Sequence, residues 1–258
     1  MTNRQGEFIW YELMTIDVDA ARAFYEPVVG WEIGTTGGTP AGEPGMAYRL
    51  IDAPDASVGG MIAIDTEMAA QGGRPLWLGY IGVDDVDATA AAIEAHGGHI
   101  HVPPSDIPGI GRFAMASDPQ GAPFYVMRGA MDGISAAFSP DAIGHCSWNE
   151  LRTPDQAAAD AFYAAIFGWT STESMPMGPA GDYRFLDAGD VRIGASMQQE
   201  GRPRWQPYFT VPSIAAAIDA VEAHDGTVDH GPHEVPGGSH IIIGTDPQGA
   251  RFALAGRP

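Results

Sequence analysis

The sequence predicts an α+β protein in which one domain occurs twice, each domain holding two β-α-β-β-β modules. A 22-residue stretch from Trp10, WYELMTIDVDAARAFYEPVVGW, matches WNELRTPDQAAADAFYAAIFGW from Trp148 at 12 positions. The pentapeptide DPQGA also occurs twice, at 118–122 and at 246–250. Further matched segments follow in the same order, so the repeat covers nearly the whole chain.

The first module begins with alternating apolar residues over 8–14, which predict a strand. Residues 17–29 carry apolar side chains at helical spacing, and Gly30 supplies the left-handed residue that commonly ends a helix. Three short strands are then expected, around Trp31, over 47–51 and over 58–64.

The second module repeats this order. Residues 76–83 are predicted to form a strand and 86–95 a helix, which the Gly97-Gly98 pair ends. The last three strands are expected at 100–102, 112–116 and 124–127. The DPQG turn joins the last two of them.

The two copies differ in length. The offset between matched segments is 138 residues early in each copy and 128 later, so we expect ten extra residues in the loops 35–45 and 63–73. The segment GAMDGISAAFSPDAIG, rich in Gly, Ala and Ser, is typical of a linker. We therefore place the first domain at 5–130, the linker at 131–142 and the second domain at 143–258.

Charge and composition exclude several kinds of partner. The chain has 13 basic residues, all of them arginine, against 33 acidic residues, a net charge of −20. Such a surface repels nucleic acid and anionic membranes, so neither is expected as a partner. The absence of lysine excludes Schiff-base chemistry and a Walker-type phosphate loop. A single cysteine, Cys146, and a start without a secretion signal predict a cytoplasmic protein.

Two repeated motifs carry a family resemblance. The string D-x(6)-FY-x(4)-GW and the DPxG turn before the last strand, each present twice, resemble the vicinal oxygen chelate superfamily. That superfamily includes glyoxalase I, fosfomycin- and bleomycin-resistance proteins and extradiol dioxygenases. The resemblance implies that each pair of modules curls its mixed sheets around a cavity. It also implies that the enzymes hold a divalent metal there on His or Gln, His and Glu ligands.

The positions that hold these ligands in the family carry other residues here. They are Trp10, Leu78 and Tyr125 in the first copy and Trp148, Gln206 and Ala253 in the second. An indole nitrogen only donates hydrogen bonds and cannot coordinate a cation. We therefore expect no metal at the usual place and no other cofactor.

Strand alternation predicts what surrounds the two tryptophans, because every second residue shares a face. The expected binding residues are Trp10, Glu12, Met14 and Tyr125 in the first copy and Trp148, Glu150, Arg152 and Gln206 in the second. An aromatic wall with one carboxylate suits a flat apolar molecule that has a hydrogen-bond donor. In the competing interpretation the tryptophans fill the space of the lost metal, and Glu150 pairs with Arg152 or another arginine.

Two functions of different classes follow. The first is a protein that binds an aromatic or drug-like metabolite without a metal, as a monomer with an internal pseudo-dimer or as a homodimer. The second is a glyoxalase-like lyase or isomerase, or a relative of the dioxygenases, with Glu12 as catalytic proton carrier or with a displaced metal. The segment DHGPHEVPGGSH is expected to be an exposed acidic loop, and it is the alternative place for such a metal. Its candidate ligands are Asp229, His230, His233, Glu234 and His240.

Overall fold

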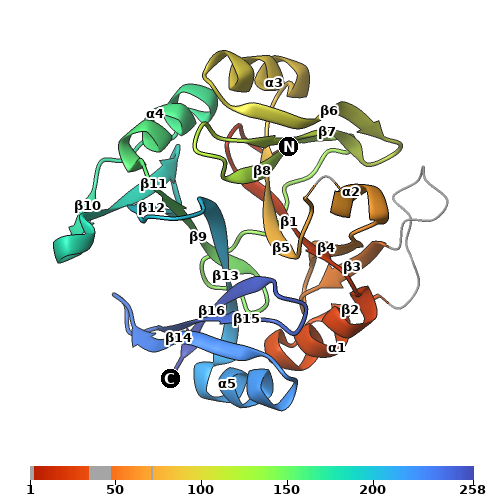
Figure 1. Cartoon of the computed structure of the whole chain (residues 1–258), viewed down its shortest axis with the longest axis vertical. Helices are drawn as coiled ribbons and strands as arrows, with labels where there is room; N and C mark the ends of the chain where they lie inside the picture. The colour runs from red at the N-terminus through yellow and green to blue at the C-terminus, as the bar shows by residue number, and fades with distance from the viewer. Residues whose placement is uncertain (1–2, 35–47, 71) are drawn as a thin grey trace.

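The computed structural model describes residues 3–34, 48–70 and 72–258, which contain two eight-stranded mixed sheets, one from each copy (Figure 1). The first sheet has the order β2-β3-β4-β1-β5-β8-β7-β6. Its strands are β1 Phe8–Thr15, β2 Glu32–Ile33, β3 Tyr48–Asp52, β4 Ser57–Ala63, β5 Leu76–Gly82, β6 His99–Ile107, β7 Gly111–Ser117 and β8 Pro123–Gly129.

The second sheet repeats this arrangement with the order β10-β11-β12-β9-β13-β16-β15-β14. Its strands are β9 Cys146–Thr153, β10 Ser174–Pro176, β11 Asp182–Ala188, β12 Val191–Gln198, β13 Arg204–Ser213, β14 Thr227–Glu234, β15 His240–Thr245 and β16 Arg251–Arg257. The helices are α1 Val18–Val29, α2 Thr66–Ala70, α3 Val86–Ala95, α4 Gln156–Phe167, the 3-10 turn η1 Gly178–Ala180 and α5 Ile214–Ala223.

Two modules join into each sheet through their first strands. In the first copy β1 pairs with β5 antiparallel, while β1 and β4, and likewise β5 and β8, pair parallel. The second copy has the same pairings between β9, β12, β13 and β16. The predicted α+β class with two β-α-β-β-β modules in each copy is thus confirmed. That the sheets curl around a cavity stays a prediction.

The repeated motif begins and ends its helix in both copies. The Asp17 side chain accepts hydrogen bonds from the backbone N–H groups of Asp19 and Ala20, which caps α1. Gly30 then ends the helix with a φ of 86°, a conformation that favours glycine. Asp155 and Gly168 begin and end α4 in the same way. The Asp and the Gly of the D-x(6)-FY-x(4)-GW string are therefore explained by local structure.

Two segments differ from expectation. The expected loop 63–73 contains the short helix α2, whose start Asp65 stabilises by accepting from the Met68 backbone N–H at 2.7 Å. The expected loop 35–45 lies outside the described residues. Strand β6 runs past its predicted end at 102, because register shifts admit Pro103 and Pro104 on an edge strand.

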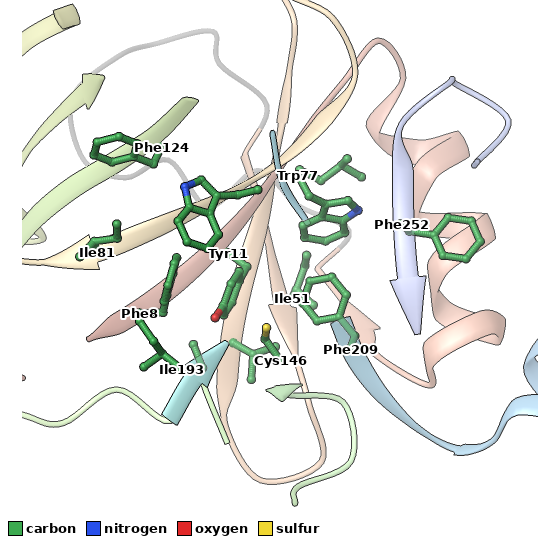
Figure 2. Close-up of a cluster of buried hydrophobic side chains, with 14 of the residues drawn as sticks. Phe8, Tyr11, Ile51, Trp77, Ile81, Phe124, Cys146, Ile193, Phe209 and Phe252 are labelled. Atoms are coloured by element: carbon green, nitrogen blue, oxygen red, sulfur yellow. The ribbon is translucent and has the colours of Figure 1, made fainter. Parts of the chain in front are cut away.

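One hydrophobic core lies between the two sheets and contains side chains from both copies. Figure 2 shows Phe8, Tyr11 and Trp77 of the first copy beside Cys146 and Phe209 of the second. The helices also meet across the copies, with α1 against α5 and α3 against α4 (Figure 1). The chain therefore forms an internal pseudo-dimer that buries its core between the repeats.

Reciprocal hydrogen bonds hold the copies together. The Tyr25 hydroxyl donates to Asp246 Oδ2 at 3.0 Å, and the Tyr163 hydroxyl donates to Asp118 Oδ2 at 3.1 Å. Each tyrosine comes from the FY pair of one copy and each aspartate from the DPQG turn of the other. Most of the motif residues that reveal the repeat in the sequence thus build the contact between the repeats.

The predicted linker packs against both copies. The Ser135 hydroxyl donates to the Ile9 carbonyl at 2.6 Å, and Ala137 is fully buried. On the other side, the Cys146 backbone N–H of the second copy donates to the Ala137 carbonyl at 3.1 Å. In the part of the chain that the structure describes, no helix is long and apolar enough to cross a membrane.

Candidate functional site

Each sheet turns one face to the shared core and the opposite face away from it. We call this second face the tryptophan face, because it carries Trp10 in the first copy and Trp148 in the second. Tyr11 and Leu13 of β1 belong to the core, whereas Trp10 and Met14 belong to a separate apolar cluster. Strand alternation thus places Trp10, Glu12 and Met14 together, as predicted.

Glu12 is the buried acid of the first tryptophan face. Its side chain is only 4% exposed. The Tyr80 hydroxyl donates to Glu12 Oε2 at 3.1 Å, and Tyr125 also hydrogen-bonds to this carboxylate. Burial raises the pKa of Glu12 to about 7, although both tyrosine hydrogen bonds act to lower it. The carboxyl group therefore changes its protonation near neutral pH.

Aromatic rings surround this carboxylate. The rings of Tyr80 and Tyr125 stack with centroids 4.2 Å apart and an interplanar angle of 12°. The Trp10 indole donates to the Tyr48 hydroxyl at 2.9 Å. Tyr48 lies over Gly60, where an added Cβ would come within 2.0 Å of the phenol oxygen. Gly60 therefore leaves the space that Tyr48 occupies.

The second copy builds the same arrangement from equivalent residues. The Trp148 indole donates to the Tyr183 hydroxyl at 2.7 Å. Tyr183 donates in turn to Glu150 Oε2 at 2.9 Å, and Tyr208 donates to Glu150 Oε1 at 3.3 Å. Both tryptophan faces thus present a tryptophan bonded to one tyrosine and a glutamate bonded to another, and in the second face Tyr183 joins the two pairs.

Tyr48, Tyr80, Tyr183 and Tyr208 were not among the binding residues predicted from the sequence. Tyr48 and Tyr183 stand at one position of the matched segments AYRLIDA and DYRFLDA. Tyr80 and Tyr208 stand at one position of RPLWLGYIGV and RPRWQPYFTV. A signal in the sequence could have identified them. Each is a tyrosine that occurs at the same position of a predicted strand in both copies.

The two faces differ in charge. Arg152 replaces Met14 and forms an ion pair with Glu150, with Nε and Oε1 2.5 Å apart. The predicted pairing of these two residues is therefore confirmed. Gln206, 2% exposed, lies opposite Glu150 in the β13–β9 ladder, where the first copy has Leu78 opposite Glu12. The second face thus carries an ion pair, while the carboxyl group of the first has no ion-pair partner among the described residues and lies among apolar and phenolic side chains.

The family's metal-ligand positions do not supply a donor set for a cation. Trp10 offers an N–H donor, which is already bonded to Tyr48, and Leu78 offers no polar atom. Burial and the nearby charge of Glu12 raise the pKa of Tyr125, so its phenol keeps the proton and acts as a donor. In the first copy the residues present therefore fit hydrogen bonding to a ligand and not the family's metal.

The histidine segment is not a loop. The segment 229–240 was expected as an exposed loop, but residues 229–234 belong to strand β14 and His240 begins strand β15 of the same hairpin. Asp229 Oδ2 accepts from the Thr245 hydroxyl at 2.8 Å. Among the described residues, no three His, Cys, Asp or Glu side chains lie together in a way that could hold a metal ion.

Comparisons of the sequence identify relatives over almost the whole chain. The model of the Glyoxalase/Bleomycin resistance protein/Dioxygenase superfamily matches residues 8–126 and again 142–254. A Mycobacterium tuberculosis protein named "Putative glyoxylase CFP32" is 34% identical over 254 residues, covering 97% of this chain and 95% of that protein. The anthracycline biosynthesis protein DnrV of Streptomyces peucetius is 30% identical over 266 residues, covering 96% of this chain and 92% of that protein.

Solved structures share the fold at lower identity. The Mn(II)-bound glyoxalase from Novosphingobium aromaticivorans aligns with a TM-score of 0.65 and 20% identity, over 98% of this chain and 82% of that one. The 2,3-dioxygenase LapB from Pseudomonas sp. KL28 aligns with a TM-score of 0.62 and 17% identity, over 99% of this chain and 93% of that one. With its two family matches in tandem and its two matching sheets, the chain belongs to the glyoxalase/bleomycin resistance protein/dioxygenase superfamily.

Proposed function

We propose that the tryptophan face of the first copy binds a small aromatic molecule bearing a hydrogen-bond donor, without the metal centre usual in the family. One observation carries the proposal: Glu12 is a buried carboxyl group whose pKa is about 7, placed among aromatic and apolar side chains. A buried carboxylate is costly unless a donor satisfies it. A ligand hydroxyl that reaches Glu12 adds such a donor beside Tyr80 and Tyr125.

The surrounding side chains fit the rest of such a ligand. Trp10 and Tyr125 offer flat apolar surfaces, and Met14 offers a flexible thioether that adapts to the shape of a ring. Glu12 and Tyr80 are buried, whereas Trp10 is partly exposed. A ligand therefore reaches the carboxyl group from the side of Trp10. The name of the relative DnrV, an anthracycline biosynthesis protein, is consistent with a fused-ring ligand.

Binding is tested with 1,4-dihydroxyanthraquinone, a flat tricyclic compound with two phenolic donors. Titration in a buffer containing a chelator follows the quenching of tryptophan fluorescence. We expect saturable binding that is weakened about ten- to a hundredfold in Glu12→Gln, because a hydrogen bond to a charged group is lost. Glu150→Gln, which removes the equivalent carboxyl group of the second copy, serves as the matched control and should bind normally. Equal loss in both variants, or no loss in Glu12→Gln, contradicts the proposal.

A second candidate function is proton transfer in a glyoxalase-like reaction. It is favoured by the same pKa of about 7, because a general base works best when its pKa lies near the operating pH. The relative named as a glyoxylase makes the adduct of methylglyoxal with a thiol a reasonable first substrate. Turnover in the presence of chelator should disappear in Glu12→Gln and persist in Glu150→Gln. Turnover that survives in Glu12→Gln excludes this role for Glu12.

A further inference from the structure

A cleft of about 360 Å³ opens between the two copies, and residues of both copies line it, Gln206 of the second tryptophan face among them. Four arginines line it: Arg74, Arg202, Arg204 and Arg251. Its lining within the described part of the chain includes no aspartate or glutamate. The cleft therefore departs from the overall charge of the chain, which has 13 basic and 33 acidic residues.

Both copies contribute to the cleft. Arg74 and Arg202 stand at equivalent positions of the repeated segments RPLW and RPRW, where β5 and β13 begin. Strand β5 of the first sheet contacts strand β13 of the second. Trp77 and Trp205, one from each strand, line the cleft. The tandem arrangement therefore gathers positive charge at the contact between its repeats.

The guanidinium group of Arg204 has only neutral partners in this cleft. It donates to Gln199 Oε1 at 3.2 Å and to the Arg202 carbonyl at 3.3 Å. Burial, together with the positive charges of Arg152 and Arg251, lowers the pKa of Arg204 to about 10. The arginines thus repel one another, and the nearby charge of Glu150 offsets only part of this effect on Arg204.

Two buried donor atoms are also left over. The Nε atoms of Arg204 and Arg251 are buried and have no hydrogen-bond partner among the described residues. The carboxylate paired with Arg251 is Asp229, at a distance of 4.0 Å between Nη1 and Oδ2. Buried polar groups are nearly always satisfied, so leftover guanidinium donors in a positively charged cleft indicate a missing acceptor.

We propose that this cleft is a second binding site, specific for a small polyvalent oxyanion, such as a molecule bearing phosphate groups. Arg204 and Arg251 bind its oxygens, and Arg74 and Arg202 complete the neutralisation from the cleft's mouth. Guanidinium groups suit this task because their planar donors match two oxygens of one phosphate or carboxylate. The site is independent of Glu12 and of the ligand proposed for the first tryptophan face.

Inorganic pyrophosphate is the probe, titrated by calorimetry at constant ionic strength with chloride as the competing anion. We expect saturable binding of one pyrophosphate per chain. Arg204→Gln and Arg251→Gln should each weaken it at least about tenfold, because each removes charge-assisted hydrogen bonds. Arg4→Gln is the matched control, since it removes the same charge from an exposed pair with Asp190. Binding that does not saturate, or an equal loss in Arg4→Gln, overturns the proposal.

Thermal unfolding separates a binding role from a structural one. In a buffer without pyrophosphate or other polyvalent anions, Arg204→Gln should unfold at the same temperature as the parent protein or higher. The substitution relieves the repulsion of Arg204 by Arg152 and Arg251. The parent should gain stability on adding pyrophosphate, and the variant should lose that gain. A variant that unfolds at a much lower temperature while it still binds pyrophosphate normally shows a structural arginine and overturns the assignment.

Discussion

Replacing Glu12 with glutamine should change how the stability of this protein depends on pH. Burial raises the pKa of Glu12 in the folded protein from 4.5 to about 7. The folded state therefore binds a proton more readily than the unfolded state. This contribution to stability is fully present below pH 4.5 and is lost as the pH rises through 7. Above that pH the folded protein holds an ionised carboxylate in an apolar site.

The size of the effect follows from the two pKa values. At about 1.4 kcal/mol for each pKa unit, the contribution of Glu12 to the free energy of unfolding falls by about 2 kcal/mol between roughly pH 5.5 and pH 8. A glutamine cannot titrate, so its variant lacks this fall. Other titrating groups contribute equally to both proteins and cancel in the difference.

The assay is urea unfolding of the parent protein and of Glu12→Gln at several pH values in this range. It stays above the isoelectric point of about 4.4, where low net charge would promote precipitation. We expect the difference in unfolding free energy, parent minus variant, to fall by about 2 kcal/mol as the pH rises. A flat difference, or one that increases with pH, would refute the assignment of a raised pKa to this buried carboxyl group.

Three further outcomes are expected. Tyr163→Phe removes the donor to buried Asp118 and should lower the free energy of unfolding by about 1–3 kcal/mol in urea titrations; an unchanged midpoint would contradict it. Gly60→Ala drives a methyl group into Tyr48, so it should cost about 1–3 kcal/mol of stability and weaken dihydroxyanthraquinone binding. Gly133→Ala, whose added Cβ meets no atom within 4 Å, should do neither. Dialysis against a chelator should leave that binding unchanged; a loss that added metal restores would point to a metal in the site.

The repeated motifs have a clear structural role. Asp17 and Gly30 begin and end α1, while Tyr25 and its partner Asp246 join the two copies. These residues explain why the two halves resemble each other, and they lie apart from the proposed ligand. Residues at equivalent positions that differ between the copies, such as Met14 and Arg152, are the ones that distinguish the two tryptophan faces.

The sequence by itself determined the local structure and the family. Alternation and helical spacing predicted most elements, and the alternation along β1 placed Glu12 beside Trp10, because these patterns depend only on neighbouring residues. The sequence also predicted that the family's metal ligands are replaced, because this prediction needs only the identity of the residues at the motif positions. The helix α2 and the strand β14 escaped prediction because neither has a strong apolar period.

Only the tertiary structure decided which distant residues meet. Tyr80 reaches Glu12 across 68 residues of chain, and Tyr25 reaches Asp246 across 221. Such contacts depend on strand order, register and the packing of one repeat on the other, which no local pattern encodes. The arginine cleft has the same origin, because Arg74 and Arg202 lie 128 residues apart and share it only after β5 and β13 have packed together.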